Sequence, residues 1–489
     1  MMGIVGQWKD LGRSKAAYRL GGSFGALTVA LGLALAGCGP DMDDHIDALG
    51  GGGAEDAKMA LSLARQDAIE PLLEAFADPE RGAEARSHMA DALYRLYLRE
   101  KTPAILVALQ GALGDQQVEV RRTVVRCLGD LEAGKAASLL IERLPEEVDD
   151  GVRQEILVTL GVISLQERDR TRGMNNVGFN RQWSVKYFDE ADRQALMDEL
   201  VRIRDLSVAD TLHGHVMEWL EGVADDLAVE ARERVLSADL AGAEQLLEEA
   251  LALVPDSRNI NQQMGKYYYG NGDIERGIKI LAANGDVLRV PRLSAAPAID
   301  GQLDARAWQR AAEITRFFQN VSRLRPIETS PATRVRLGWT DDRIFILVEG
   351  DEPSTDNLRI EATQRDENAW QDDCVEIFFD ANRDGRSYHQ IVVNSLGTIF
   401  DQYSDGSSPQ GDLGWNADME HAVVVSESGW SLEIGLPLAQ LTESAGPISG
   451  QVWGFNLARI RQEASEYGQW APTYGSALRP DRFGFLIFE

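Results

Sequence analysis

The chain has 489 residues, which is too long for one ordinary domain and predicts about three. Its composition, 44% hydrophobic and 26% charged, is typical of globular domains that each bury a core. The formal net charge is −29, from 49 basic and 78 acidic residues. This balance excludes the basic surface that nucleic-acid binding requires, and much of the negative charge is expected on solvated helix faces.

Residues 1–37 have the pattern of a secretory signal peptide. Basic residues from Lys9 to Arg19 precede an apolar run, FGALTVALGLALAGC, that is too short to span a membrane securely. The run ends in Leu-Ala-Gly-Cys38, which resembles the bacterial lipobox, after which the cysteine becomes the lipid-modified first residue. A signal peptide cleaved without lipid is the alternative. The resemblance implies a protein of the bacterial cell envelope, lipid-anchored through Cys38 and facing the periplasm or the cell surface.

The segment that follows, residues 38–58, is acidic and rich in glycine, so we expect a tether and not a packed element. After Cys38, only two of the three cysteines remain, Cys127 and Cys374. They fall in different predicted domains, so no structural disulfide is expected. Both are predicted to be buried as small apolar groups.

Residues 59–228 show helical periodicity and internal repetition. Three similar segments place Arg86, Arg121 and Arg153 at equivalent positions, and each is preceded by an apolar helix and an acidic turn. The pattern resembles HEAT repeats, helical pairs that stack to bury a continuous core and form an α-solenoid. We expect the repeated arginine to bind turn carboxylates and helix-end carbonyls. A protein partner is expected on such a solenoid, and the sequence does not identify it.

A different repeat occupies residues 229–285. Two segments align with Asp239 opposite Asp273 and Leu247 opposite Leu281, a separation of 34 residues. This spacing resembles a tetratricopeptide unit. One unit is too short to fold alone, so we expect it to cap the helical repeats and join them to the domain that follows.

Residues 286–489 read as an all-β domain. Two strand-like runs, Cys374 to Phe379 and Tyr388 to Val393, flank a turn in which Asp380, Asn382 and Asp384 occupy alternate positions before a glycine. This is the first half of a calcium loop, but the twelfth position is an isoleucine, which excludes an EF-hand. A calcium-binding hairpin turn and a plain Asn/Asp/Gly turn both remain open.

The order of motifs from residue 299 to residue 489 resembles the family 9 carbohydrate-binding modules. The motifs are IDGQLDARAW, VRLGWTDDRIFILVEGDEP, WQDDCVEIFFD, YHQIVVNSLGTIFD, GWSLEIGLPLAQL, WGFNLARI and FGFLIF. The resemblance implies a β-sandwich that binds glycans without cutting them. Four tryptophans lie in framework motifs and are expected in the core: Trp308, Trp339, Trp430 and Trp453.

The resemblance also implies a sugar site. The family stacks a sugar ring between two tryptophans; Trp370 matches the first, and its polar surroundings indicate an exposed ring. Glu376 and Asn394 match residues that hydrogen-bond the sugar hydroxyls. Two positions depart from the family, because Ala477 stands near the second clamp tryptophan and Val392 replaces an arginine. The aromatic residues that could supply the missing wall are Trp470, Trp415 and Tyr474, and Trp470 matches a family tryptophan that need not touch ligand.

The sequence contains none of the common catalytic patterns. It has no Gly-x-Ser-x-Gly elbow, no His-Glu-x-x-His helix and no phosphate-binding loop, and the abundance of carboxylates is no sign of glycoside hydrolysis. Met419 and His421 share a strand face, yet haem needs ligands on opposite sides of the ring, so this pair cannot supply both. We therefore expect a binding protein, not an enzyme, with calcium as the one candidate cofactor and no organic cofactor.

The predicted function is that of a non-catalytic lipoprotein that binds carbohydrate through its C-terminal sandwich and a protein through its helical repeats. The alternative is a structural lipoprotein whose sandwich docks another protein. A further alternative is an accessory part of a carbohydrate catabolic system that hydrolyses glycosides.

Overall fold

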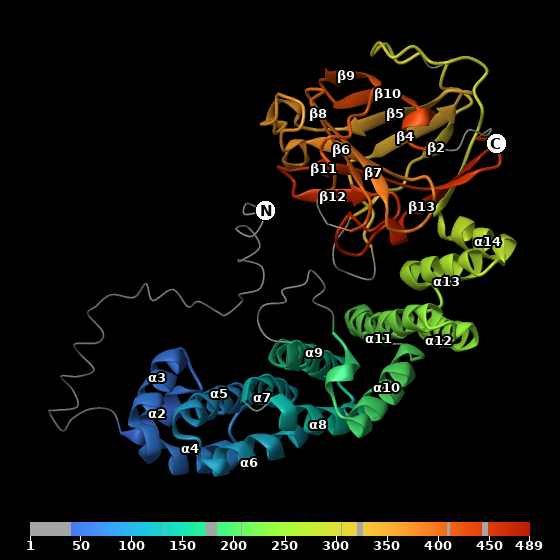
Figure 1. The fold of residues 1–489 in the computed structure, drawn as a ribbon. Coiled ribbons are helices and arrows are strands. Elements are labelled where there is room, and N and C mark those ends of the chain that lie inside the picture. Colours follow the sequence, from blue (N-terminus) through green and yellow to red (C-terminus); the bar gives the residue numbers. More distant parts are fainter. Residues whose placement is uncertain are drawn as a thin grey trace. The chain divides into compact units, whose positions relative to one another are not determined.

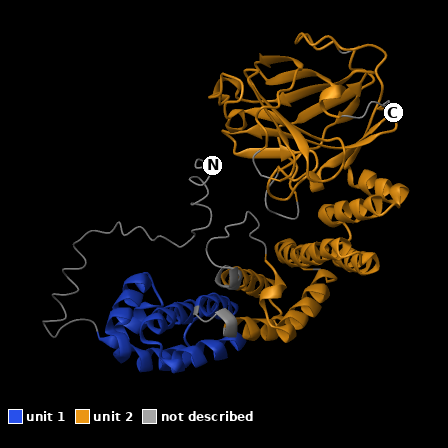
Figure 2. Ribbon diagram, viewed as in Figure 1, with its two compact units in different colours: residues 1–131 blue, residues 132–489 orange. Residues whose placement is uncertain are grey.

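The structure is a computed structural model that describes residues 41–131, 133–172, 183–206, 208–304, 306–319, 326–407, 411–442 and 448–489. The chain divides after Leu131 into two compact units (Figure 2). The first unit is helical, and the second contains further helices followed by two β-sheets (Figure 1). The predicted class, helical repeats followed by an all-β sandwich, is confirmed. The predicted signal peptide and Cys38 lie outside the described residues.

The helices of the first unit are α2 (Met42–Ala48), α3 (Ala54–Ala64), α4 (Ile69–Ala77), α5 (Ala83–Glu100), α6 (Pro103–Gly111) and α7 (Val118–Leu131). The repeated arginines have the structural role that the sequence predicts. Arg86 donates to the carbonyl of Phe76 at 3.0 Å and forms a 2.6 Å ion pair with Asp115. Arg121 donates to the backbone carbonyl of the same Asp115 at 2.8 Å. Each arginine thus fixes the turn between two helices, where carbonyls lack helical partners.

The expectation of an unpacked tether over residues 38–58 is wrong from residue 41 onward. The Asp41 side chain accepts a hydrogen bond from the backbone of Met42 and forms a capping box with Asp44, which starts α2. Ile46 and Leu49 are buried, so the short helix packs into the first unit. The acidic residues that suggested a solvated tether therefore serve as helix-starting residues.

The helices of the second unit are α8 (Ala133–Arg143), α9 (Asp150–Arg172), α10 (Glu190–Arg204), α11 (Asp210–Leu236), α12 (Leu240–Leu253), α13 (Arg258–Gly270) and α14 (Ile274–Asn284). Asp239 and Asp273, which the sequence repeat aligns, both cap helices, α12 and α14 respectively. Helices α13 and α14 approach closely at Gly277, where an added Cβ would lie 2.5 Å from the backbone nitrogen of Tyr269.

Two sheets form the sandwich. The eight-stranded sheet has the order β1 (Val287–Val290), β13 (Gly484–Phe488), β11 (Val452–Arg461), β6 (Cys374–Asp380), β7 (Tyr388–Asn394) and β8 (Ile399–Ser404), and β12 (Glu466–Gln469) links β11 to β3 (Phe318–Gln319). The five-stranded sheet has the order β2 (Ala312–Ile314), β4 (Thr333–Trp339), β5 (Arg343–Asp351), β10 (Gly429–Pro437) and β9 (Glu420–Ser426).

Side-chain alternation along the strands produces the core between the two sheets. Val375, Ile377 and Phe379 of β6 share one face, and they pack in the same cluster as Leu432 and Ile434 of β10. The four framework tryptophans are buried as predicted: Trp308, Trp339, Trp430 and Trp453. The remaining cysteines are also buried and free, in agreement with the sequence.

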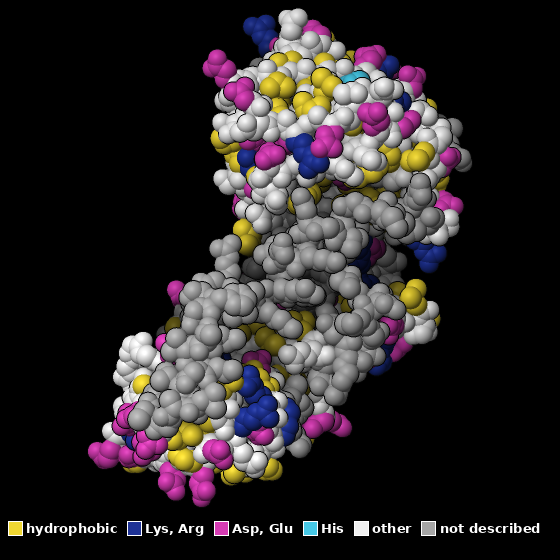
Figure 3. Space-filling model, turned by 90° about the vertical axis from the view of Figure 1, so that its left-hand side faces the viewer, with side chains coloured by type: hydrophobic (Ala, Val, Ile, Leu, Met, Phe, Trp, Pro, Cys, Tyr) yellow, Lys and Arg dark blue, Asp and Glu magenta, His cyan; other side chains and the backbone are white. Residues whose placement is uncertain are grey.

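The negative charge is distributed over the surface. On the face of the sandwich that Figure 3 shows, acidic and basic side chains are interspersed. Such a surface favours solubility through net repulsion, and it does not single out a cationic partner. Among the described residues, no helix combines the length and the apolar character needed to cross a membrane.

Candidate carbohydrate-binding site

The candidate site lies on the face of the eight-stranded sheet that points away from the core. Because alternate residues share a face, Cys374, Glu376 and Phe378 of β6 lie on this outer face. Glu376 pairs in register with Val392 on β7 and with Ala458 on β11. The predicted sugar residue Glu376 therefore has an apolar neighbour on each adjacent strand.

A row of three polar side chains crosses the outer face from β6 to β8. Gln390 of β7 donates to a Glu376 carboxylate oxygen at 3.3 Å, and Gln402 of β8 donates to Gln390 at 2.6 Å. Each of the three side chains is at most 6% exposed. Burial raises the pKa of Glu376 to about 7, and the hydrogen bond from Gln390 opposes this shift. The polar row of Glu376, Gln390 and Gln402 thus presents a carboxyl group that changes charge near neutral pH.

One end of the outer face is covered by the segment that carries Trp370. Trp370 lies in a short 3-10 helix, Ala369–Gln371, just before β6. Its ring is half-buried and packs edge-on against Phe400, with ring centroids 4.4 Å apart. The Trp370 carbonyl accepts a hydrogen bond from Gln462 at 3.2 Å. The ring is therefore held on one side by Phe400, and part of the residue remains exposed.

Asn394 holds this covering segment and does not face solvent. It has no exposed surface, and its amide group donates to the carbonyl of Ala362 at 2.9 Å and to Asp372 at 2.8 Å. Its side-chain oxygen accepts from the backbone of Leu396 and Thr398. The prediction that Asn394 binds sugar hydroxyls is therefore corrected, because both of its polar atoms already have partners within the protein.

The other end of the outer face is covered by the loop 474–482, in which the missing clamp residue was expected. Ala477 and Leu478 of this loop pack against Phe378 and Tyr388. Position 477 is an alanine, so it provides no second aromatic ring opposite Trp370, as the sequence indicates. Tyr474 does not replace the missing ring, because it is 4% exposed and has no surface for a ligand. The site thus has an aromatic wall at Trp370 and an aliphatic wall at the loop 474–482.

Neither of the other two candidate tryptophans completes the clamp. Trp470 is 4% exposed and packs against Phe455 in the core, so its predicted role in sugar binding is corrected to a structural one. Trp415 is half-buried and lies against His389, with ring centroids 4.6 Å apart. Because His389 and Gln390 are consecutive residues of a strand, Trp415 lies on the opposite face of the sheet from the polar row. It cannot form a clamp with Trp370.

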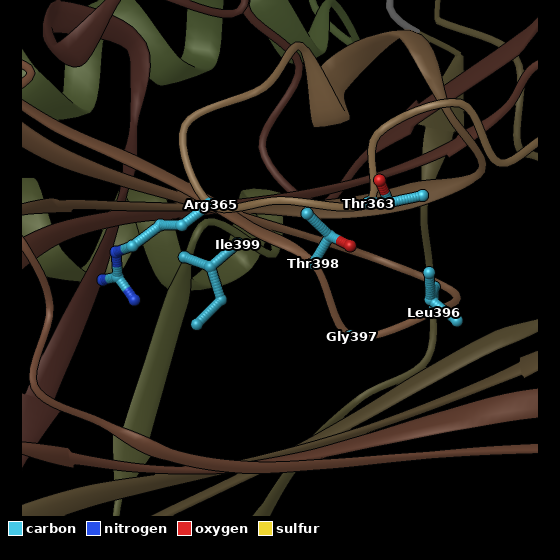
Figure 4. A pocket seen from close by; sticks show the side chains of 6 residues that line it. All are labelled: Thr363, Arg365, Leu396, Gly397, Thr398 and Ile399. Atoms are coloured by element: carbon cyan, nitrogen blue, oxygen red, sulfur yellow. The ribbon is translucent and has the colours of Figure 1, made fainter.

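Two hollows of the sandwich lie apart from the polar row. One, of about 310 Å³, is lined by Thr363, Arg365, Leu396, Gly397, Thr398 and Ile399 (Figure 4). Arg365 lies at one end of this hollow, and its guanidinium already bonds Asp401, Asn416 and the carbonyl of Ala417. The other hollow, of about 290 Å³, is lined by Trp308, Gln309, Ala311, Glu313 and Arg336. Because the basic group of each hollow is already ion-paired, we place the candidate site at Trp370 and the polar row.

The predicted calcium residues form a self-contained turn. Asp384 accepts from the backbones of Arg386 and Ser387, both at 2.7 Å, and its pKa is lowered by these bonds even though burial raises it. Asp380 accepts from Gly385 at 3.0 Å, and burial raises its pKa to about 6. Asn382 donates to Asp384 at 3.3 Å. Within the described ranges, no group of three or more His, Cys, Asp or Glu side chains is placed to hold a metal.

Calcium binding by this turn stays a prediction, and a melting experiment tests it. An ion that binds only the folded state stabilises it by mass action, so the melting temperature of the sandwich should be higher in millimolar Ca²⁺ than in EDTA. Asp384→Asn should remove the difference, because it removes a formal charge from the turn. Equal melting temperatures of the wild type in the two buffers would assign the three side chains to the turn alone.

The fold is a β-sandwich that follows helical repeats in the sequence. In particular, residues 299–487 match the family model for carbohydrate family 9 binding domain-like sequences, and residues 69–161 match the model for HEAT repeats. The C-terminal sandwich thus matches the family 9 model, and part of the helical region matches the HEAT model, as the sequence motifs indicate.

Two curated relatives match part of this chain. The endo-1,4-beta-xylanase A of Thermotoga maritima is 26% identical over 204 residues, and that of Thermotoga neapolitana is 27% identical over the same length. In each case the match covers 39% of this chain and 17% of the xylanase. The chain therefore spans only a small part of the curated relatives that it matches.

Solved structures of similar fold include two carbohydrate-binding proteins. One is a putative carbohydrate-binding protein from Bacteroides uniformis, 18% identical, which covers 42% of this chain and 99% of its own, with a TM-score of 0.34. Another is a family 9 carbohydrate-binding module from Caldicellulosiruptor kristjanssonii in complex with glucose, 21% identical. It covers 41% of this chain and 95% of its own, with a TM-score of 0.31.

Sequence reasoning found Trp370 and Glu376 but missed Gln390 and Gln402. Gln390 lies in the predicted strand Tyr388 to Val393, whereas Gln402 lies in β8, a strand that the sequence analysis does not predict. Their alignment with Glu376 depends on the register between β6, β7 and β8, which the structure supplies.

Proposed function

We propose that this protein is a non-catalytic, carbohydrate-binding lipoprotein of the bacterial cell envelope. The observation that carries the proposal is the half-exposed ring of Trp370 on the same sheet face as the Glu376 carboxyl group, in a domain that matches a carbohydrate-binding family. A pyranose presents an apolar C–H face to an aromatic ring and hydroxyl groups to a carboxylate. The relatives named above, a xylanase and a glucose-bound module, support a glucan or xylan oligosaccharide as the ligand.

A glycan panel tests this proposal directly. The chain from residue 39 onward should bind gluco- or xylo-oligosaccharides with micromolar to millimolar affinity, because one aromatic wall replaces the two of a full clamp. Isothermal titration against glucose, xylose and their short oligomers measures the affinity. No binding at millimolar sugar would contradict the proposal and favour the alternative of a protein-docking sandwich.

The alternative has one structural observation in its favour. Trp370 belongs to a small apolar cluster with Phe400 and Val392, and the polar row beside it is almost fully buried. A half-exposed aromatic ring beside a narrow polar strip also suits contact with a protein surface. Capture of a protein by the wild type, lost in Trp370→Ala, together with no sugar binding, would establish this alternative.

The proposed lipid anchor rests on the sequence Leu35 to Cys38. If Cys38 is acylated, Cys38→Ala should release the protein from the membrane fraction or leave an uncleaved precursor of higher mass. Several acyl chains hold a lipoprotein firmly, whereas one chain anchors marginally. Membrane fractionation and intact mass of the two variants provide the measurement, and unchanged values for both would contradict the anchor.

We also propose a protein partner for the helical repeats. Met59 and Leu63 lie four residues apart on α3, so they share one face of the helix, and they are 56% and 61% exposed. Two adjacent exposed apolar side chains on a repeat protein support an interaction surface. Crosslinking of the intact protein in membranes, compared with Met59→Ser/Leu63→Ser, would identify the partner.

A further inference from the structure

The loop 474–482, the aliphatic wall of the candidate site, is bonded to helix α13, which lies outside the sandwich. Gln262 of α13 donates to the backbone carbonyl of Arg482 at 3.0 Å, and Lys266 donates to the backbone carbonyl of Asp481 at 2.8 Å. The Arg482 side chain reaches back to α13 and donates to Asn259 at 2.5 Å. With a fourth bond, from Arg482 to the Gln262 side-chain oxygen at 3.4 Å, these hydrogen bonds join the end of the loop to one helix.

The bonds between Gln262 and Arg482 and between Arg482 and Asn259 are buried, so water does not readily replace them, whereas the bond of Lys266 is part-buried. Gln262 and Asn259 have no exposed surface, and Arg482 is 3% exposed. Asn259 is itself held by Asp225 of α11, to which it donates at 2.9 Å. A buried carbonyl that loses its donor costs about 1 to 3 kcal/mol, so the loop backbone has a strong preference for the position that α13 sets.

A second set of contacts joins the same helix to the strand that follows the loop. The ring of Tyr269 packs against Phe485 of β13, with centroids 4.8 Å apart, and its hydroxyl accepts from Arg383 in the turn after β6. The Lys266 ammonium lies 5.2 Å from the centroid of the Phe485 ring. Helix α13 thus contacts β13 and the turn after β6 as well as the loop.

The other surface of the loop faces the candidate site. Ala477 and Leu478 pack on Phe378, which follows Glu376 by two residues on the same face of β6. Trp370 covers the opposite end of that face, above Cys374. Phe378 lies four positions after Cys374 on the extended strand, a span of about 13 Å. The width of the strip that contains Glu376 therefore depends on where the loop lies.

We propose that helix α13 is part of the sugar site, and that Lys266 and Gln262 are positioning residues that fix the loop 474–482 as the wall opposite Trp370. This inference rests on the proposed sugar binding. It assigns the helical unit next to the sandwich a role in sugar affinity, in addition to its role as a connection. The two side chains act through the backbone carbonyls of Asp481 and Arg482 and touch no ligand themselves.

The experiment replaces both donors in the chain from residue 39 onward. Lys266→Met/Gln262→Leu keeps the length of the side chains, removes both hydrogen bonds to the loop and leaves the sandwich sequence intact. We expect sugar affinity to fall about tenfold. Hydrogen exchange should become faster in residues 474–482 but not in residues 366–372, which carry the Trp370 wall.

Two variants serve as controls. Lys279→Met removes an exposed lysine of α14 and should bind sugar as the wild type does. Lys266→Arg, with Gln262 unchanged, keeps a hydrogen-bond donor at position 266. It should keep most of the sugar affinity that the double variant loses. General destabilisation of the protein would not produce this recovery. Both are measured by titration with the oligosaccharide that the wild type binds.

The outcomes separate the inference from the function on which it rests. If the wild type binds sugar and the double variant binds equally well, α13 does not position the site, although the sugar function stands. If hydrogen exchange in residues 474–482 is unchanged in the double variant, α13 does not hold the loop and the inference is likewise overturned. If the wild type binds no sugar, the proposed function and this inference fail together.

Discussion

Trp370→Ala should weaken sugar binding by ten- to a hundredfold, which corresponds to about 1 to 3 kcal/mol for an aromatic face buried against a sugar ring. The loss of stability should be smaller, because Trp370 is only half-buried at the edge of the small apolar cluster that includes Phe400 and Val392. Titration with the best oligosaccharide of the glycan panel measures affinity, and urea unfolding measures stability.

Trp308→Ala is the matched control, since it removes a tryptophan from the same domain at a core position. Trp308 is 2% exposed, packs with Leu293, Phe345 and Leu347, and donates to the Glu433 carboxylate at 3.2 Å. Its loss should destabilise the domain by about 3 to 5 kcal/mol. If Trp370→Ala lowers the melting temperature as much as Trp308→Ala does, Trp370 is a core residue and the sugar site is not at this ring.

The architecture could be predicted because each of its signals is local in sequence. The helical repeats show their period and a repeated arginine, and the strands show apolar runs between turn residues. Three of the four framework tryptophans, Trp339, Trp430 and Trp453, sit within these runs, so their burial follows from the strands themselves. The fold can be predicted from such a sequence because its local patterns agree with the global fold.

The orientation of site residues could not be predicted in the same way. Asn394 ends a strand next to a turn, and whether its amide group faces solvent depends on Ala362 and Asp372, which lie 32 and 22 residues away. The sequence places Asn394 on the correct sheet face, but only the structure shows the segment that covers it. Trp470 illustrates the same limit, because its motif does not indicate whether the ring faces the core or a ligand.

The acidic start of the first unit shows a third limit. Asp41 and Asp44 read as charged, solvated residues, yet the same side chains accept the backbone hydrogen bonds that begin α2. Composition alone does not distinguish these two uses of a carboxylate. The burial of Ile46, four residues after the first residue of the helix, is the feature that decides between them.

Glu376→Gln should stabilise the protein relative to the wild type at high pH. The pKa of Glu376 is about 7 in the folded protein, compared with 4.5 as its ordinary value, because burial penalises the charged form. Between these two pH values the folded state holds a proton that the unfolded state has lost, so the stability of the wild type falls as pH rises toward 7. Between pH 5 and pH 8, the ionisation of Glu376 should lower the free energy of unfolding of the wild type by about 2 to 3 kcal/mol.

The difference between the two proteins isolates this group, because the other titrating residues are common to both. Urea unfolding at pH 5 and pH 8, followed by circular dichroism, should show a smaller decrease in the unfolding free energy for Glu376→Gln than for the wild type. Parallel decreases for the two proteins would show that the Glu376 carboxyl group is not held neutral by burial, and that the polar row is open to water.

The raised pKa of Glu376 also predicts how sugar binding depends on pH. A carboxylate accepts hydrogen bonds from sugar hydroxyls more strongly than a carboxylic acid does, so the wild type should bind more tightly at pH 8 than at pH 6. Val392 and Ala458, the register partners of Glu376, carry no charge that would hold it ionised. Glu376→Gln should bind more weakly at pH 8 and with little change between the two pH values. If the wild type binds equally at pH 6 and pH 8, the Glu376 carboxylate does not contact the sugar, and Trp370 alone provides the site.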